Sequence, residues 1–197
     1  MKKSIGVLLC ISLLCMCFTA CGAPNGKMTE KNITATVDTA FEALQNFDTE
    51  NLNKYVESDT LSSIMKFAEK YPQFAELGKA IFKNLTYEIT EINIDEKTVT
   101  LSVKNKDLYD SAHSFAEELK SEYSLLQLLA VLSKPEFLDT KLKELCTAID
   151  NAGFADSSIE ITLTIVQDTD HLVFSFDEDA ENGVSGGALS GIKEIYS

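Results

Sequence analysis

The side chains that could support catalysis are few and scattered along the chain. Tyr87 alternates in phase with the apolar residues two positions before and after it, so we expect its ring on the apolar face of a strand, with the hydroxyl reaching inward. His113 has Asp110 three residues before it and Glu117 four residues after it. Those spacings place all three on one helix face, which makes a weak histidine–carboxylate cluster. A surface histidine is the simpler interpretation.

Metal chemistry has little support in the sequence. The second histidine, His171, falls in a predicted turn, where we expect it to be solvated. The nearby acidic run could suggest calcium, but Asn182 stands where a calcium loop needs glycine, and no glutamate occupies the twelfth position. We therefore expect a solvated acidic run, with no metal site and no cofactor. The run comprises Asp168, Asp170, Asp177, Asp179 and Glu181.

Other sites are equally weak. Cys146 lies beside the apolar positions Leu142 and Leu145 of a predicted helix, so we interpret it as a small buried apolar residue rather than a nucleophile. The glycine-rich segment 183–187 lacks the lysine of a phosphate-binding loop, and we interpret it as a flexible turn. The sequence predicts no catalytic residue.

Composition excludes several classes of protein. The chain has 197 residues, 45% of them hydrophobic, with 31 acidic and 17 basic side chains and a net charge of −14. All the basic residues are lysine, and tryptophan is absent. A nucleic-acid-binding protein needs a basic surface, which this chain cannot form. The hydrophobic share is typical of a globular protein and too high for a disordered one.

The N-terminus predicts export. Lys2 and Lys3 precede an apolar run over residues 5–18, which has the charge and length of a secretory signal. A membrane-spanning helix needs about 20 apolar residues, so this run is too short to remain as an anchor. The sequence therefore predicts a removable leader over residues 1–20.

The residues after this run predict a lipid anchor. Thr19 and Ala20 precede Cys21 and Gly22, a segment that resembles the lipobox of bacterial lipoproteins, although Phe18 stands where leucine is more usual. The resemblance implies cleavage before Cys21 and attachment of a diacylglyceryl group to its sulfur. Two acyl chains anchor a protein stably. The expected location is the extracytoplasmic face of the cell membrane.

Removal of the leader takes two lysines away and leaves a net charge of −16. Anionic headgroups repel such a surface, so we expect the lipid alone to contact the membrane. Residues 21–32 are expected to form the lipidated cysteine and a flexible tether. Residues 33–197 are expected to form one domain.

Within this domain the hydrophobic period changes twice. Helical spacing runs from Ile33 to Ile81, with breaks near Asp48 and Pro72, and gives way to period two in a predicted hairpin over residues 85–103. The apolar phase slips by one residue between Ile89 and Ile92, as it does at a β-bulge. The first half is therefore predicted to be helices followed by a hairpin.

The second half repeats this order. One long helical stripe runs from Leu108 to Ala130, and another helix is expected from Pro135 to about Gly153. A second hairpin is predicted over residues 159–176. The strands alternate apolar with polar residues, so we expect an α+β domain whose antiparallel sheet, of about four strands, has one face covered by several helices.

This order of elements resembles small Gram-positive surface lipoproteins that carry a cystatin-like, nuclear-transport-factor-2-like domain of unknown function. The matching segments cover most of residues 33–195, although relatives often have tryptophan where this chain has Phe174 or Phe176. The resemblance implies a curved sheet that wraps a long helix into a cone, and it transfers no catalytic residue. The segments are 84–89, 97–103, 161–166, 172–176 and 185–189.

Three functions remain open. The leading hypothesis is a lipid-anchored, non-enzymatic binding or accessory module for a peptide, a protein or a small apolar ligand. The alternative is an isomerase or hydrolase in the cone that uses Tyr87 and a buried carboxylate, which would require a pocket of ~300 Å³ or more around them. A purely structural protein of the cell surface is the third, and it would expose a large apolar patch.

Overall fold

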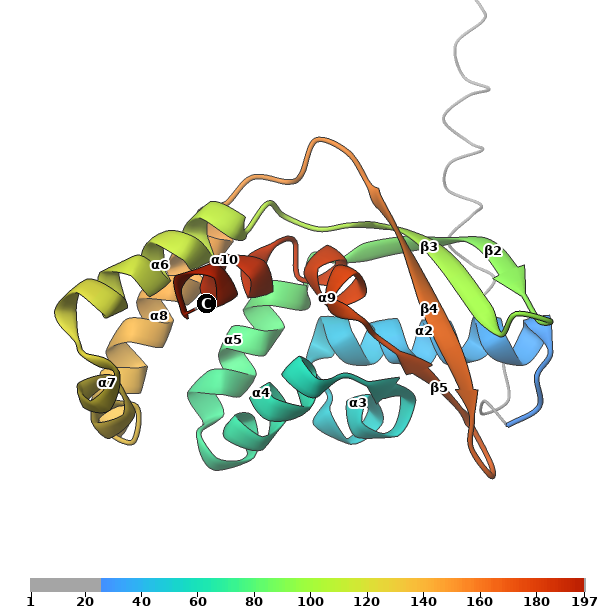
Figure 1. The fold of residues 1–197 in the computed structure, drawn as a ribbon, viewed down its shortest axis with the longest axis horizontal. Helices are drawn as coiled ribbons and strands as arrows, with labels where there is room; N and C mark the ends of the chain where they lie inside the picture. Colours follow the sequence, from blue (N-terminus) through green and yellow to red (C-terminus); the bar gives the residue numbers. More distant parts are fainter. Residues whose placement is uncertain (1–25, 197) are drawn as a thin grey trace, which may run out of the picture.

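A β-sheet forms one end of the molecule, and a group of helices forms the other (Figure 1). The structure is a computed structural model that describes residues 26–196. The helices are α2 (Glu30–Asn46), α3 (Thr49–Tyr55), α4 (Asp59–Lys70), α5 (Pro72–Phe82), α6 (Tyr109–Glu122), α7 (Leu125–Val131), α8 (Pro135–Asn151), α9 (Glu178–Val184) and α10 (Ala188–Tyr196). The strands are β1 (Val56–Glu57), β2 (Thr86–Asn93), β3 (Thr98–Lys104), β4 (Ile159–Gln167) and β5 (Leu172–Ser175).

The fold class is α+β, with a mixed sheet in the order β1-β5-β4-β3-β2. Strands β2 to β5 form the predicted antiparallel hairpins and pair with each other through β3 and β4. The expectation of about four antiparallel strands misses β1, which pairs with β5 in parallel through Val56 and Phe174. A strand of two residues is too short to show alternation of apolar and polar residues. The sequence of β1 therefore could not be distinguished from the end of α3, which precedes it directly.

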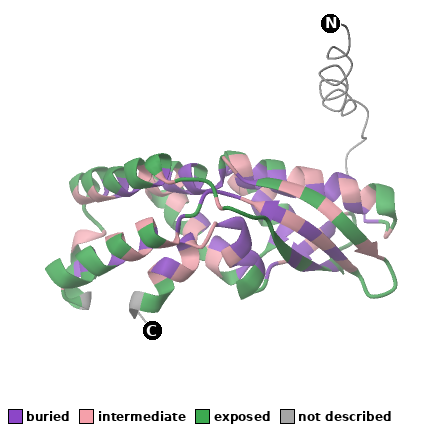
Figure 2. Cartoon of the chain, turned by 90° about the horizontal axis from the view of Figure 1, so that it is seen from above, coloured by how far each residue is buried: buried purple, intermediate pink, exposed green. Residues whose placement is uncertain are grey.

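One face of the sheet is apolar and packs against helices, as predicted. In β3 the buried residues alternate with partly exposed ones, and β4 repeats the pattern (Figure 2). Helix α2 supplies the opposite side of the core through the stripe that contains Val37, Phe41 and Leu44, all fully buried. The register of β2 against β3 shifts between Ile89 and Glu91, which confirms the predicted bulge.

The long helix predicted after residue 107 is interrupted. Helix α6 ends at Glu122, and α7 starts after Ser124, whose side chain forms a capping box with Gln127. A capping box satisfies free backbone groups at a helix start, so it stabilises a new helix in place of a continuous one. The apolar spacing continued across this break and concealed it.

The C-terminal segment is also more ordered than the sequence suggested. Residues 183–187 were expected to be a flexible turn, but residues 183 and 184 end α9, and residues 185–187 link α9 to α10. Gly186 and Gly187 adopt positive φ angles of 60° and 83°, which glycine adopts without steric cost. The backbone N–H of Leu108 donates to the Gly186 carbonyl at 2.7 Å, which fixes this junction against the start of α6.

The start of the described chain is fixed to the sheet. Gln167 Nε2 donates to the carbonyl oxygen of Gly26 at 2.5 Å, and Gly26 is buried against the β4–β5 turn. Helix α2 begins at Glu30, within the segment expected to be a tether. The leader over residues 1–20 and Cys21 lie outside the described residues. Between residues 26 and 196, no helix combines the length and apolar character needed to cross a bilayer.

Candidate functional site

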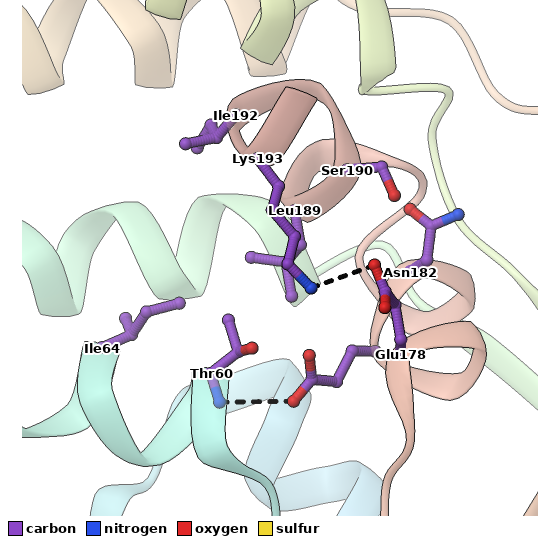
Figure 3. A pocket seen from close by; sticks show the side chains of 9 residues that line it. Thr60, Ile64, Glu178, Asn182, Leu189, Ser190, Ile192 and Lys193 are labelled. Carbon is purple, nitrogen blue, oxygen red and sulfur yellow. Dashed lines mark hydrogen bonds and ion pairs between the residues drawn. The ribbon is translucent and has the colours of Figure 1, made fainter. Parts of the chain in front are cut away.

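A cavity of about 570 Å³ opens between α4, α9 and α10. Its volume is within the range of ~300–1,000 Å³ typical of small-molecule sites. Figure 3 shows Ile64 and Ile192 on one side of the cavity and Asn182, Ser190 and Glu178 on the other. The cavity therefore has an apolar part and a polar part. Its lining residues are Thr60, Ile64, Glu178, Glu181, Asn182, Leu189, Ser190, Ile192 and Lys193.

Glu181 supplies the buried carboxylate of the cavity, with only 7% of its surface exposed. Asp177 places it, because the Asp177 side chain accepts from the Ala180 backbone N–H at 2.8 Å and starts α9. The Ser58 hydroxyl donates to Glu181 Oε1, and the Thr60 backbone N–H donates to the same oxygen at 3.3 Å. These bonds fix the carboxylate against the N-terminus of α4, where negative charge is favoured.

Two further features mark the polar part of the cavity, an ion pair and a buried oxygen without a partner. Lys193 Nζ donates to Glu178 Oε1 at 3.0 Å, which links α10 to α9 (Figure 3). Asn182 Oδ1 is buried and has no hydrogen-bond partner. An unpaired buried acceptor costs about 1–3 kcal/mol, so a donor on a bound molecule would relieve this cost. The cavity can therefore take an apolar molecule with a polar head.

Tyr87 lies elsewhere, between β2 and α2. Its hydroxyl donates to Asp38 Oδ1 at 2.7 Å, and its ring centroid is 4.4 Å from that of Phe41. Burial raises the pKa of Tyr87 above its usual value, and the hydrogen bond to Asp38 raises it further. Tyr87 does not line the 570 Å³ cavity. The structure thus pairs Tyr87 with a half-buried carboxylate and does not bring it to Glu181.

Neither histidine is placed as a base beside this cavity. His113 Nδ1 is 3.9 Å from Glu117 Oε2, beyond hydrogen-bonding distance, and its ring stacks on Tyr109. His171 was expected to be solvated, but its side chain is only 14% exposed, because its ring packs edge-on against Tyr55. Its Nδ1 is 2.5 Å from Asp170 Oδ1. This contact lowers the pKa of the Asp170 carboxyl.

Cys146 is half-buried in α8 and packs against the core. Burial, followed by the charge of Asp150, raises the pKa of its thiol. A raised pKa disfavours the thiolate, which is the nucleophilic form. In the region from residue 26 to residue 196, no three His, Cys, Asp or Glu side chains are grouped so that they could hold a metal ion.

The sequence interpretation missed the cavity, because it treated residues 177–182 as a solvated charge run. That interpretation is wrong for Glu181, which is buried. A signal was present: Asp177 is a good N-cap residue, and Ala180, Val184 and Ala188 recur every four residues. This spacing predicts helical structure with a buried face, and Glu181 stands next to that face.

No protein-family model, no curated protein and no solved structure matches this chain.

Proposed function

We propose that this chain is a lipid-anchored, extracytoplasmic binding module that holds a small apolar ligand in the cavity between α4, α9 and α10. The observation that carries the proposal is the cavity itself. It is large enough for a small molecule, it is mostly apolar, and it contains a buried carboxylate and an unpartnered amide oxygen. A few fixed polar groups in an apolar cavity are typical of ligand sites.

The anchor and the location rest on the N-terminal sequence. The two lysines, the apolar run and the small residues before Cys21 support export and lipidation. The acidic surface supports membrane attachment through the lipid alone, and it also disfavours nucleic acids as partners.

We also propose that the domain is related to the cystatin-like, nuclear-transport-factor-2-like domains of surface lipoproteins. The packing of the 17-residue helix α2 on the apolar face of the sheet supports this relationship. A cone would require the sheet to curve around α2, and the bulge in β2 favours such bending.

Photolabelling of the full chain in lipid nanodiscs tests the binding function. The probe is octanol with a diazirine in its alkyl chain, which forms a covalent bond to neighbouring residues on illumination. We expect mass spectrometry to find the label on α4 and α10 around Ile64, Leu189 and Ile192.

A matched pair of variants identifies the site. Leu189→Phe places a larger ring in the cavity and should reduce the label there at least fivefold. Leu129→Phe makes the same change on α7, where the side chain is 61% exposed, and should leave the cavity label unchanged. Labelling that is confined to α7, or that is insensitive to Leu189→Phe, would contradict the proposal.

A further inference from the structure

The chemistry of the cavity walls points to the kind of head group that the ligand carries, an inference that rests on the proposed binding function. Three ionisable side chains line the cavity: Glu178, Glu181 and Lys193. Lys193 and Glu178 lie 3.0 Å apart and compensate each other. Among the described residues, the hydrogen bonds to the Glu181 carboxylate come from two neutral donors, Ser58 Oγ and the Thr60 N–H.

Two acceptors that line the cavity retain hydrogen-bonding capacity. Within the described residues, both hydrogen bonds accepted by the Glu181 carboxylate end on Oε1, which leaves Oε2 to a ligand. Asn182 Oδ1 is a second acceptor without a partner. Two oxygen acceptors, one of them charged, match a head group that donates several hydrogen bonds and carries positive charge.

We propose that the ligand is an apolar molecule with a primary ammonium head, which donates to Glu181 Oε2 and Asn182 Oδ1 while its hydrocarbon part contacts Ile64, Leu189 and Ile192. The apolar surroundings strengthen the attraction between the ammonium group and the carboxylate, because little water screens it. The net charge of −14 on the whole chain favours the approach of cations over long distances.

The same arrangement disfavours the other common amphiphiles. A fatty acid would bring its carboxylate toward Glu181, and the cation available to it, Lys193, already pairs with Glu178. A fatty alcohol can donate only one hydrogen bond, so it cannot satisfy both acceptors. The expected order of affinity is therefore amine, then alcohol, then carboxylate.

Competition against the octanol photolabel tests this order. The full chain in nanodiscs of zwitterionic lipid is titrated with octylamine, 1-octanol or octanoate at pH 7, and the free concentration of each competitor is measured in the dialysate. We expect octylamine to halve the cavity label at a concentration at least tenfold lower than octanol requires, and octanoate to be the weakest.

The variant Glu181→Gln tests whether the Glu181 carboxylate causes the preference for octylamine. Glu181→Gln keeps the size of the side chain and removes its charge, so octylamine and octanol should then compete within about twofold of each other. Asn46→Asp, which adds a charge on the exposed surface of α2 outside the cavity, should leave the tenfold preference intact.

The outcomes separate the two proposals. If the photolabel does not reach the cavity of the unaltered chain, both the binding function and the ammonium preference fail. If it reaches the cavity but octanol or octanoate competes as well as octylamine does, only the ammonium preference is overturned. The competition between octylamine, octanol and octanoate on the unaltered chain tests the ammonium preference even if Glu181→Gln does not fold.

Discussion

Tyr87 shows what the alternation of residues along a strand can predict about a side chain and what it cannot. The alternation of β2 correctly placed the Tyr87 ring toward the helices, but only the packing of α2 shows that its hydroxyl meets Asp38. The two residues are 49 positions apart in the chain, so neither local periodicity nor spacing could reveal the contact. A side chain's partner across a core depends on how whole elements pack.

Replacing Tyr87 by phenylalanine tests the assignment of this residue to packing. Tyr87→Phe removes one hydrogen bond and leaves Asp38 without its donor, so we expect the free energy of unfolding to fall by about 0.5–1.5 kcal/mol. Urea denaturation at pH 7 measures this change. Photolabelling of the cavity should be unaffected, and loss of the label would place Tyr87 in the binding site.

The same variant has a signature at high pH. The pKa of Tyr87 is raised in the folded state above its ordinary value of 10, so its contribution is fully present below pH 10 and declines as the pH rises further. The stability of the unaltered chain should therefore fall above pH 10 more steeply than that of Tyr87→Phe. If the stability of both proteins fell equally steeply above pH 10, the pKa of the Tyr87 hydroxyl would not be raised by burial.

Gly186 is a position where the backbone geometry tolerates no side chain. Its φ is +60°, and an added Cβ would lie 2.0 Å from the carbonyl oxygen of Lys106. We expect Gly186→Ala to lower the free energy of unfolding by at least about 2 kcal/mol. Gly153 has nothing within 4 Å of an added Cβ, so Gly153→Ala should change stability by less than about 0.5 kcal/mol. Equal effects would contradict this account.

At the scale of elements, the sequence predicted those with a strong period and missed those whose boundaries depend on capping. The hairpins and the bulge in β2 follow from alternation, because one face of each strand is buried. The break between α6 and α7 and the start of α9 depend on single capping residues, Ser124 and Asp177. A period averaged over many residues does not detect such local interactions. The cavity was missed for this reason, since α9 forms one of its walls.

Lys141 joins two of the helices at the end of the molecule opposite the sheet. Its Nζ is 2.5 Å from Glu118 Oε1 and 3.5 Å from Glu122 Oε2, both on α6, and 3.5 Å from Glu144 Oε2 on α8. The hydrogen bond to Glu118 and the neighbouring carboxylates raise the pKa of Lys141. Without the ammonium group, three carboxylates would face each other across the α6–α8 contact.

We therefore expect Lys141→Met to lower the free energy of unfolding by about 1 kcal/mol at low salt. The loss should shrink in 1 M NaCl, where the Debye length is only about 3 Å. Lys143→Met, an exposed change on the same helix, is the matched control and should have little effect. Urea denaturation at both salt concentrations measures the difference, and a loss that is independent of salt would instead indicate packing of the lysine stem.

At the scale of the whole molecule, the position of Gly26 determines how a lipid at Cys21 would orient the domain. Gly26 is bound to the β4–β5 turn, and five residues span at most about 18 Å. The turn and α7 lie at opposite ends of the long axis (Figure 1). The turn would therefore face the membrane, and α7, where Leu126 is 80% exposed, would point away from it.

Fluorescence quenching checks this orientation. In a Cys146→Ser background, a fluorophore is attached to Thr169→Cys in the β4–β5 turn or to Ala130→Cys on α7, and the lipidated protein is placed in nanodiscs with spin-labelled headgroups. We expect strong quenching at position 169 and little at position 130, because the short link holds only the first site near the headgroups. Stronger quenching at position 130 would mean that the leucines of α7 contact the bilayer. The domain would then lie with α7, and not the β4–β5 turn, toward the membrane.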